Sequence, residues 1–284
     1  MAIFTNQATL SYNDTTTMSN IVTGEIVEVL SAAKNALDDE YRLGDVITYV
    51  ISIINSGTTA IGGISITDDL GAYTVGGLTR FPLTYVQGSA NYYANGILQT
   101  PPTVVAGPPL VLGGITIPAG GNAVVIYEAS VNDFAPLTAN ATITNTATIS
   151  GSGLTSDIVV SDTITAATTP QLSITKSLSP ETIPENGQLT YTFVIQNTGN
   201  TAAVATDNAA ITDLFDPVLN DISVVLNGVA LTEPAQYVYN EATGLFQTVP
   251  GIITVPAATY TQDPVTGQWN IVPGVTVLTV TGTI

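Results

Sequence analysis

Two lysines are the residues of this 284-residue chain most able to do chemistry, because they occupy matching places in two internal repeats. A lysine amine is a nucleophile only when it is neutral, and burial favours the neutral form. A carboxylic acid kept protonated by burial can polarise an amide carbonyl and carry protons. Lys34 is matched with Asp68 and Lys176 with Asp213, since each aspartate follows Ile-Thr at the same point of its repeat. These residue types suit either a nucleophilic amine with an assisting acid or a buried ion pair.

The ionic alternative stays open at this stage. A lysine at the edge of a sandwich core can pair with Asp68 or Asp213 as a buried salt bridge. The asparagine of the Thr-Asn-x-Ala-Thr sequence, Asn145, can hydrogen-bond a turn backbone. Glu128 is a second candidate acid in the first repeat, but its counterpart in the second repeat is not acidic. The matched aspartates are therefore preferred.

The repeats themselves are strand-like. Residues 47–57 read ITYVISIINSG and residues 189–199 read LTYTFVIQNTG, at equal distances from the two lysines. Both segments alternate apolar and polar residues with a period of two and end in turn residues, which predicts half-buried strands. Further matches are ITD at 66–68 and 211–213, Asn-Gly turns at 95–96 and 227–228, and ITIP at 115–118 against ITVP at 253–256. The pattern predicts two similar modules.

The first dozen residues repeat a segment from inside the chain. Residues 4–11 read FTNQATLS, and residues 143–150 read ITNTATIS. The internal copy closes the first module with the strand predicted at 157–166, whereas the N-terminal copy precedes any module that it could close. Residues 19–30 likewise resemble 156–164. We interpret the N-terminal copy as a final strand separated from its own fold.

The second repeat lacks the corresponding strand. Its terminal segment, 275–284, aligns with 124–131, because Pro-Gly precedes it much as a Pro and Gly turn precedes the earlier strand. A rival alignment places 275–284 on 142–149, but Thr or Val then fills the asparagine position. Under either alignment the second repeat has no Asn strand.

The expected fold is all-β, with two tandem antiparallel β-sandwich modules of immunoglobulin-like (Ig-like) type. Thr, Val, Ile, Ala, Asn and Gly dominate the sequence, and they are typical of short strands joined by tight turns. The predicted parts are a donor segment at 1–30, module 1 at 31–168 and module 2 at 169–284. Module 2 is incomplete, and an N-terminal strand from a neighbouring subunit completes it.

An incomplete sandwich exposes unpaired strand edges and an open core. A strand added from another chain pairs with the edge and covers the core. The predicted donor residues are Phe4, Thr5, Asn6, Ala8 and Leu10. Because donor and acceptor lie at opposite ends of the chain, the contact is head-to-tail and leads by default to open filaments.

The composition excludes several function classes. A formal charge of −18 disfavours nucleic acid and anionic lipid as partners. The sequence has no cysteine and no histidine, which removes disulfides, thiolate sites and most nucleophile-base pairs. We therefore expect no enzymatic turnover, no cofactor and no metal. No recognisable signal peptide, membrane span or sortase-type sorting signal is present, so covalent wall anchoring by that route is not suggested.

The repeated landmarks resemble the bacterial surface "conserved repeat domain" family. They are Lys-(x)n-Ile-Thr-Tyr-x-Ile-x-Ile-x-Asn-x-Gly, Ile-Thr-Asp and Thr-Asn-x-Ala-Thr, and they recur twice over nearly the whole chain. The resemblance implies Ig-like modules with a structural role on a bacterial cell or spore surface. The permuted, incomplete second module departs from the family pattern and suggests polymerisation.

The Lys-Asn arrangement also resembles Gram-positive pilins and adhesins, which join such pairs by an isopeptide bond. In an Ig-like sandwich the first strand lies beside the last, so Lys34 should lie near Asn145. Lys176 should then lie near Asn6 of a neighbouring subunit. The resemblance implies a single-turnover, autocatalytic crosslink within each subunit and another between subunits, with Asp68 and Asp213 as the assisting acids.

The expected function is therefore that of a structural subunit of an extracellular filament, similar to a pilus or a spore appendage. Its partners are copies of itself in a head-to-tail homopolymer. The alternative is a surface adhesin or ligand-binding module of a cell wall or S-layer, without polymerisation.

Overall fold

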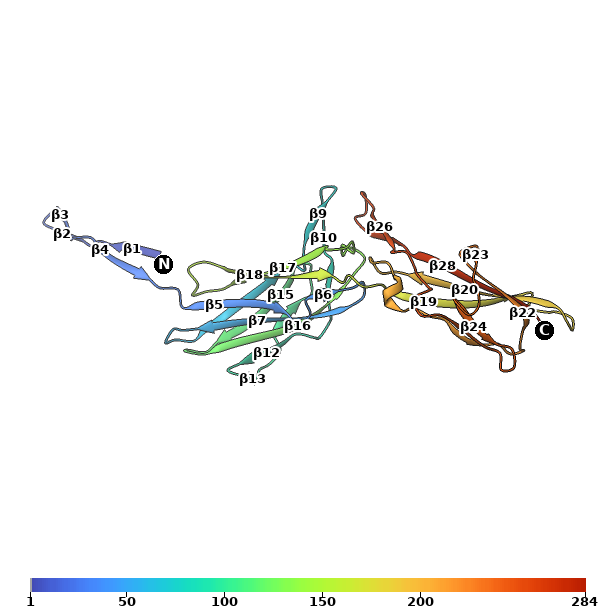
Figure 1. Ribbon diagram of the computed structural model, residues 1–284. Coiled ribbons are helices and arrows are strands. Elements are labelled where there is room, and N and C mark those ends of the chain that lie inside the picture. The colour runs from blue at the N-terminus through green and yellow to red at the C-terminus, as the bar shows by residue number, and fades with distance from the viewer. Residues whose placement is uncertain (1) are drawn as a thin grey trace. The chain divides into compact units, whose positions relative to one another are not determined.

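The computed structural model describes residues 2–284, and its regular secondary structure is almost entirely antiparallel β-strand (Figure 1). The chain divides into two compact units. The first runs to Pro136 and includes Thr142–Thr165, and the second comprises Leu137–Ala141 and Ala166–Ile284. Within the described residues, no helix has the length and apolar character needed to cross a membrane. The one helical segment recorded there is a single 3-10 turn, Ala205–Asp207.

The first unit is a sandwich of two six-stranded sheets. One sheet has the order β13-β12-β16-β7-β5, and β11 also pairs with β16. Its strands are β5 (Leu30–Ala36), β7 (Val46–Asn55), β11 (Leu83–Tyr85), β12 (Asn91–Ala94), β13 (Ile97–Leu98) and β16 (Asn122–Val131). Alternate residues of β7 are buried, as the period-two pattern predicts, and Tyr49, Ile51 and Ile53 have no exposed surface.

The facing sheet has the order β14-β15-β8-β17-β18-β6. Its strands are β6 (Glu40–Tyr41), β8 (Ile61–Asp68), β14 (Thr103–Val105), β15 (Leu110–Ile117), β17 (Thr142–Ser150) and β18 (Ile158–Ala166). A small ribbon is formed by β9 (Tyr73–Val75) and β10 (Leu78–Arg80). Strand β17 therefore lies inside this sheet, between β8 and β18.

The second unit has a five-stranded sheet of order β19-β20-β28-β22-β23 and a three-stranded sheet of order β21-β25-β24. The strands of the first are β19 (Leu172–Ser179), β20 (Gln188–Asn197), β22 (Asn220–Leu226), β23 (Val229–Ala230) and β28 (Gly274–Thr283). Those of the second are β21 (Thr212–Leu214), β24 (Tyr237–Asn240) and β25 (Leu245–Thr248), and β26 (Thr259–Gln262) pairs with β27 (Trp269–Val272). Phe215 and Phe246 are fully enclosed in its core.

The two units match strand for strand in one sheet. Strand β16 pairs with β7 and β12, and β28 pairs in the same way with β20 and β22. Tyr127 lies opposite Tyr49 in the first unit, and Val280 lies opposite Tyr191 in the second. The alignment of 275–284 with 124–131 is thus confirmed, and the rival alignment with 142–149 is wrong.

The other sheet differs between the units. In the first unit β8 pairs with β15 on one side and with β17 on the other. In the second unit β21 pairs with β25 alone, and among residues 2–284 no strand takes the places of β17 and β18. One edge of β21 is therefore unpaired within the described chain.

Residues 2–26 form an antiparallel hairpin, which we name the N-terminal ribbon. Strand β1 (Ala2–Asn6) pairs with β4 (Val22–Ile26), and β2 (Thr9–Tyr12) pairs with β3 (Thr15–Met18). These two pairs form sheets separate from those of the first sandwich. Asn13 and Asp14, with φ of 43° and 61°, make the tight turn, a conformation that Asn and Asp tolerate better than most residues. Three residues, 27–29, connect β4 to β5, and five residues, 167–171, connect β18 to β19.

Candidate functional site

The first lysine site lies inside the first sandwich. Lys34 on β5 points into the core, and its Nζ lies 2.6 Å from Oδ2 of Asp68 at the end of β8. Both side chains have no exposed surface. The other carboxylate oxygen, Oδ1, accepts a hydrogen bond from the backbone N–H of Leu70 at 3.0 Å. The structure thus places the lysine and its sequence-matched acid in direct contact.

A tyrosine connects this pair to the asparagine of β17. The hydroxyl of Tyr127 donates to Oδ2 of Asp68 at 2.6 Å and accepts a hydrogen bond from Nδ2 of Asn145 at 3.1 Å. Asn145 is fully buried, and its Oδ1 has no hydrogen-bond partner among the described residues. The amine and the amide are therefore linked through Asp68 and Tyr127, with no direct hydrogen bond between them.

Burial sets the protonation tendencies of this cluster. It lowers the pKa of Lys34, although the neighbouring charge of Asp68 opposes that change. Burial also raises the pKa of Tyr127 well above its usual range, so the hydroxyl keeps its proton and remains a donor. A desolvated amine, a carboxyl group and a carboxamide, all buried in one core, are the groups that amide exchange between side chains requires.

Sequence reasoning did not identify Tyr127. The lysines and acids match between the repeats, whereas the position of Tyr127 is occupied by Val280 in the second copy. The alternative acid, Glu128, follows Tyr127 directly on β16, so its side chain points to the opposite face of the sheet. Glu128 is thus excluded from the lysine site.

The second lysine site contains the same two residue types in a more open setting. Lys176 on β19 forms an ion pair with Asp213 on β21, and their side chains are 38% and 19% exposed. The Lys176 Nζ lies 4.3 Å from the ring centroid of Tyr191, a cation–π contact. Since β17 lies beside Asp68 in the first unit, with Ala147 as the opposite residue, the missing neighbour of β21 accounts for the opening.

The inward residues of β19 show the same opening. Leu172, Ile174 and Leu178, which alternate with Lys176, are 43%, 53% and 44% exposed. Their counterparts on β5 are Leu30, Ala32 and Ala36, and all three are half-buried. We name these three β19 residues, together with Lys176 and Asp213, the acceptor face.

The predicted donor residues lie on the exposed N-terminal ribbon. Phe4 is 50% exposed and Leu10 62%, and Asn6 is opposite Val22. The Phe4 ring lies so close over the Gly24 backbone that a Cβ at that position would be 2.3 Å from it. Thr5 pairs with Thr23, and Ala8 is exposed beside Ser19. Apolar side chains on a two-stranded hairpin without a core favour association with another surface.

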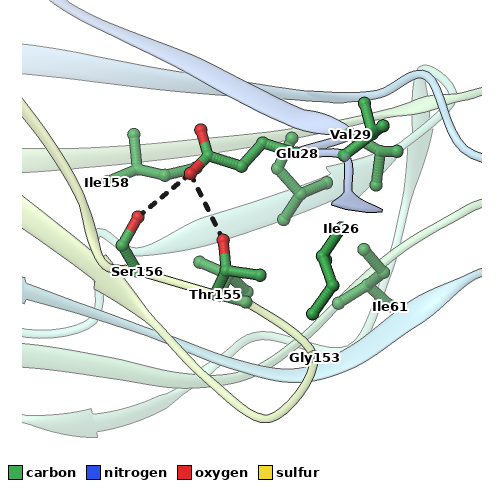
Figure 2. Close-up of a pocket in the computed structure, with 11 residues that line it drawn as sticks. Ile26, Glu28, Val29, Ile61, Gly153, Thr155, Ser156 and Ile158 are labelled. Carbon is green, nitrogen blue, oxygen red and sulfur yellow. Dashed lines mark hydrogen bonds between the residues drawn. The ribbon is translucent and has the colours of Figure 1, made fainter. Parts of the chain in front are cut away.

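A small cavity lies where the ribbon joins the first sandwich (Figure 2). Its volume is about 50 Å³, and its lining includes Ile26 and Ile61. The carboxylate of Glu28 accepts hydrogen bonds from Thr155 at 3.2 Å and Ser156 at 3.4 Å, as Figure 2 shows. The cavity has room for little more than a water molecule or two, and these bonds hold the start of β5 to the 151–157 loop.

No protein-family model matches the sequence, and no curated protein matches it. Solved structures with a similar fold include BcpA, the major pilin of Bacillus cereus, at 13% identity and a TM-score of 0.37, covering 95% of this chain and 73% of that one. The major pilin SpaD of Corynebacterium diphtheriae matches at 11% identity and a TM-score of 0.36, covering 86% of this chain and 59% of that one. The collagen-binding domain of a Staphylococcus aureus adhesin matches at 11% and 0.30, covering 47% and 96%. The chain is an all-β protein of antiparallel Ig-like sandwiches.

Proposed function

We propose that this chain is the structural subunit of an extracellular filament on a bacterial cell or spore surface, in which the N-terminal ribbon of one copy completes the second sandwich of the next. The observation that carries the proposal is a matched pair of features. The second unit has an open place where the first unit holds β17 and β18. Residues 4–11 of the ribbon have a sequence similar to that of β17, but the ribbon has no core of its own.

Both parts gain from this association. The unpaired edge of β21 has backbone groups available for a ladder, and an added antiparallel strand satisfies them. The ribbon's apolar side chains and those of the acceptor face leave water together, which is the dominant favourable contribution to association. Because the ribbon and the acceptor face occupy different ends of the sequence, every copy can donate once and accept once. Such a heterologous contact extends into a filament when it does not close into a ring.

The lysine sites give this filament its covalent links. Within a subunit, the neutral amine of Lys34 attacks Cγ of Asn145, a new Nζ–Cγ bond forms, and the Cγ–Nδ2 bond breaks. Asp68 takes the proton that the amine loses and transfers it to the departing nitrogen, so that ammonia leaves and no oxidant is consumed. Between subunits, Lys176 and Asp213 act in the same way on Asn6 of the inserted ribbon.

Negative-stain microscopy of the intact chain at rising concentration tests the proposed function. The expected result is long, unbranched filaments whose number and length increase with protein concentration. A discrete monomer or dimer at every concentration would contradict polymerisation, whatever the state of the lysines.

Replacing Lys176 separates the covalent link from the assembly. We expect Lys176→Arg to form filaments, because the ribbon and the unpaired edge remain and Arg keeps the charge that pairs with Asp213. Boiling in detergent should then release single subunits, whereas the unaltered filament should give a ladder of covalent multimers. Lys34→Arg is the matched control and should keep the ladder, and a ladder from Lys176→Arg would exclude Lys176 as the crosslinking residue.

Tyr127→Phe tests the connection within the first site. Loss of the hydroxyl removes a hydrogen bond from Asp68 and another from Asn145, both fully buried. In a first unit that has not crosslinked, we expect the free energy of unfolding to fall by about 1–3 kcal/mol, the cost of a buried polar group left unsatisfied. Urea unfolding followed by hydrogen exchange measures this loss, and Tyr93→Phe, at a half-buried tyrosine on β12, is the control expected to change little.

A further inference from the structure

The first sandwich contains a template for how the ribbon sits in the second. Strand β17 runs antiparallel to β8, with Ala147 opposite Asp68 and Ile149 opposite Ile66. Alternate residues of β17 point into the core, and Ile143, Asn145, Ala147 and Ile149 are all buried. Thr148 lies opposite Thr67 on the outer face, where both residues are half-buried. One fixed register thus connects the asparagine to the lysine through Tyr127 and Asp68, and places the small alanine beside the aspartate.

The sequence repeats transfer this register to the second unit. Residues 4–11 correspond to 143–150, and residues 211–213 correspond to 66–68. We propose that the ribbon enters the second unit of another copy antiparallel to β21, with Ala8 opposite Asp213, Thr9 opposite Thr212 and Leu10 opposite Ile211. This inference depends on the proposed filament, and it adds the residue-level pairing and the face that the ribbon buries.

In this register the inward-facing side chains suit the space available. Phe4, Ala8 and Leu10 take the places of Ile143, Ala147 and Ile149, so the apolar character of each position is kept. Ala8 is the small residue opposite the aspartate, as Ala147 is in the first unit. A slip of one residue would turn Phe4 and Leu10 outward and leave the acceptor face open. A slip of two would keep the faces but move Asn6 by about 7 Å along the strand, away from Lys176.

The ribbon brings its own outer strand with it. In the ribbon, β1 pairs with β4, β2 pairs with β3, and Ala8 between them accepts a hydrogen bond from the N–H of Ser19, as one edge of β17 pairs with β18. The opposite edge of residues 4–11 is therefore the one available to β21. The hairpins differ in their pairing, since Asn6 is opposite Val22 whereas Asn145 is opposite Asp162. The tight turn at Asn13 and Asp14 replaces the longer 151–157 loop and accounts for the shifted partner. The ribbon therefore enters as a preformed two-stranded unit rather than as a single extended strand.

Disulfide trapping tests the register on a chain that has no cysteine of its own. Thr212→Cys is combined in turn with Gln7→Cys, Thr9→Cys and Ser11→Cys, all at exposed positions on one face. The expected pair, Thr9 with Thr212, corresponds to Thr148 with Thr67, whose Cα atoms are directly opposite, within the roughly 4–7 Å that a disulfide spans. Lys176→Arg is included in every variant, so that crosslinks seen in detergent come from the disulfide alone.

We expect only Thr9→Cys with Thr212→Cys to yield multimers under oxidising conditions, and reductant to return them to single subunits. The register would be overturned, with polymerisation left intact, if the filaments crosslinked through position 7 or 11. The same holds if they crosslinked through all three positions equally or through none. The proposed function, and the pairing with it, would instead be overturned if no sample formed filaments under reducing conditions. These samples include every cysteine variant and the cysteine-free Lys176→Arg chain. Microscopy of the reduced samples distinguishes these outcomes.

Discussion

We expect removal of residues 2–26 to convert the proposed filament subunit into a monomer. The deletion takes away the donor strands but leaves both sandwiches, whose core residues lie outside the ribbon. We expect complete loss of filaments by negative-stain microscopy and a monomeric mass by light scattering after gel filtration. The first unit should keep its thermal transition, because the ribbon strands pair only with one another.

Point variants provide a matched control for this deletion. Phe4→Asp with Leu10→Asp places two charges on the face that we expect to be buried, and desolvation of carboxylates there should prevent assembly. Ile3→Asp with Thr5→Asp places two charges on the other face of β1 and should allow it. Equal behaviour of the two double variants would contradict insertion with a defined inner face.

Moving the ribbon provides a gain-of-function control. The rearranged chain consists of residues 27–284, then a copy of 132–141, then residues 2–26. Because 132–141 connects β16 to β17 in the first unit, this linker should let the ribbon fill the second unit of the same chain. The expected product is a monomer in which the second unit unfolds at a higher temperature than in the deletion variant. Filaments that persist after the deletion, or a rearranged chain whose second unit gains no stability, would refute strand donation.

Asp68→Ala gives the second large effect, a strong destabilisation of the first unit. The change leaves the amine of Lys34 in a site with no exposed surface and without its partner. Relative to a first unit that has not crosslinked, removal of one member of this buried ion pair should cost about 3–5 kcal/mol. Relative to a crosslinked first unit, the variant also lacks the amide bond. The variant should also keep the full mass calculated from its sequence, whereas the unaltered first unit should be lighter by one ammonia. Hydrogen exchange in urea and intact-mass spectrometry measure the two effects on the ribbon-deleted chain.

Asp213→Ala is the matched control in the same ribbon-deleted chain. Lys176 is 38% exposed there, so water can solvate its ammonium when the carboxylate is removed. Exposed ion pairs are worth about 0–1 kcal/mol, and we expect a loss in that range for the second unit. Equal losses from the two substitutions would show that the second site is as closed as the first, which would contradict an acceptor face open to another copy.

Much of the fold was predictable because the strands have strong period-two patterns. Residues 47–55 alternate buried and less buried side chains along β7, and their repeat at 189–197 does so along β20. The pairing of each lysine with its aspartate followed from equal spacing in the two copies, since similar sequences adopt similar sheets.

Two features of the site could not be predicted from the repeats. The counterpart of Tyr127 in the second repeat is the apolar Val280. A comparison of the repeats therefore does not identify the hydroxyl that joins Asp68 to Asn145. The different exposure of Lys34 and Lys176 is set by whether a strand lies beside β8 or β21, and such a neighbour comes from distant sequence. The local periodicity of a strand therefore does not predict which strand lies beside it. The roles of the lysines and asparagines in crosslinking remain predictions.

The short connections described for the two units determine how a filament of this kind carries tension. In the first unit the chain enters the sandwich at Leu30, which lines the small cavity together with Leu154. It leaves near Thr165, whose N–H donates a hydrogen bond to the carbonyl oxygen of Asp39 at the other end of the sandwich. Pulling on the unit therefore acts along the strands and loads the whole ladder in shear, which resists rupture better than peeling one bond at a time. A ribbon inserted in the second unit of another copy continues through residues 27–29 into its own first unit. Tension on this connection would load the second unit of that other copy in shear as well. In the proposed filament, each junction between two chains would then lie within a sandwich, where many hydrogen bonds and the proposed amide crosslink would share the force.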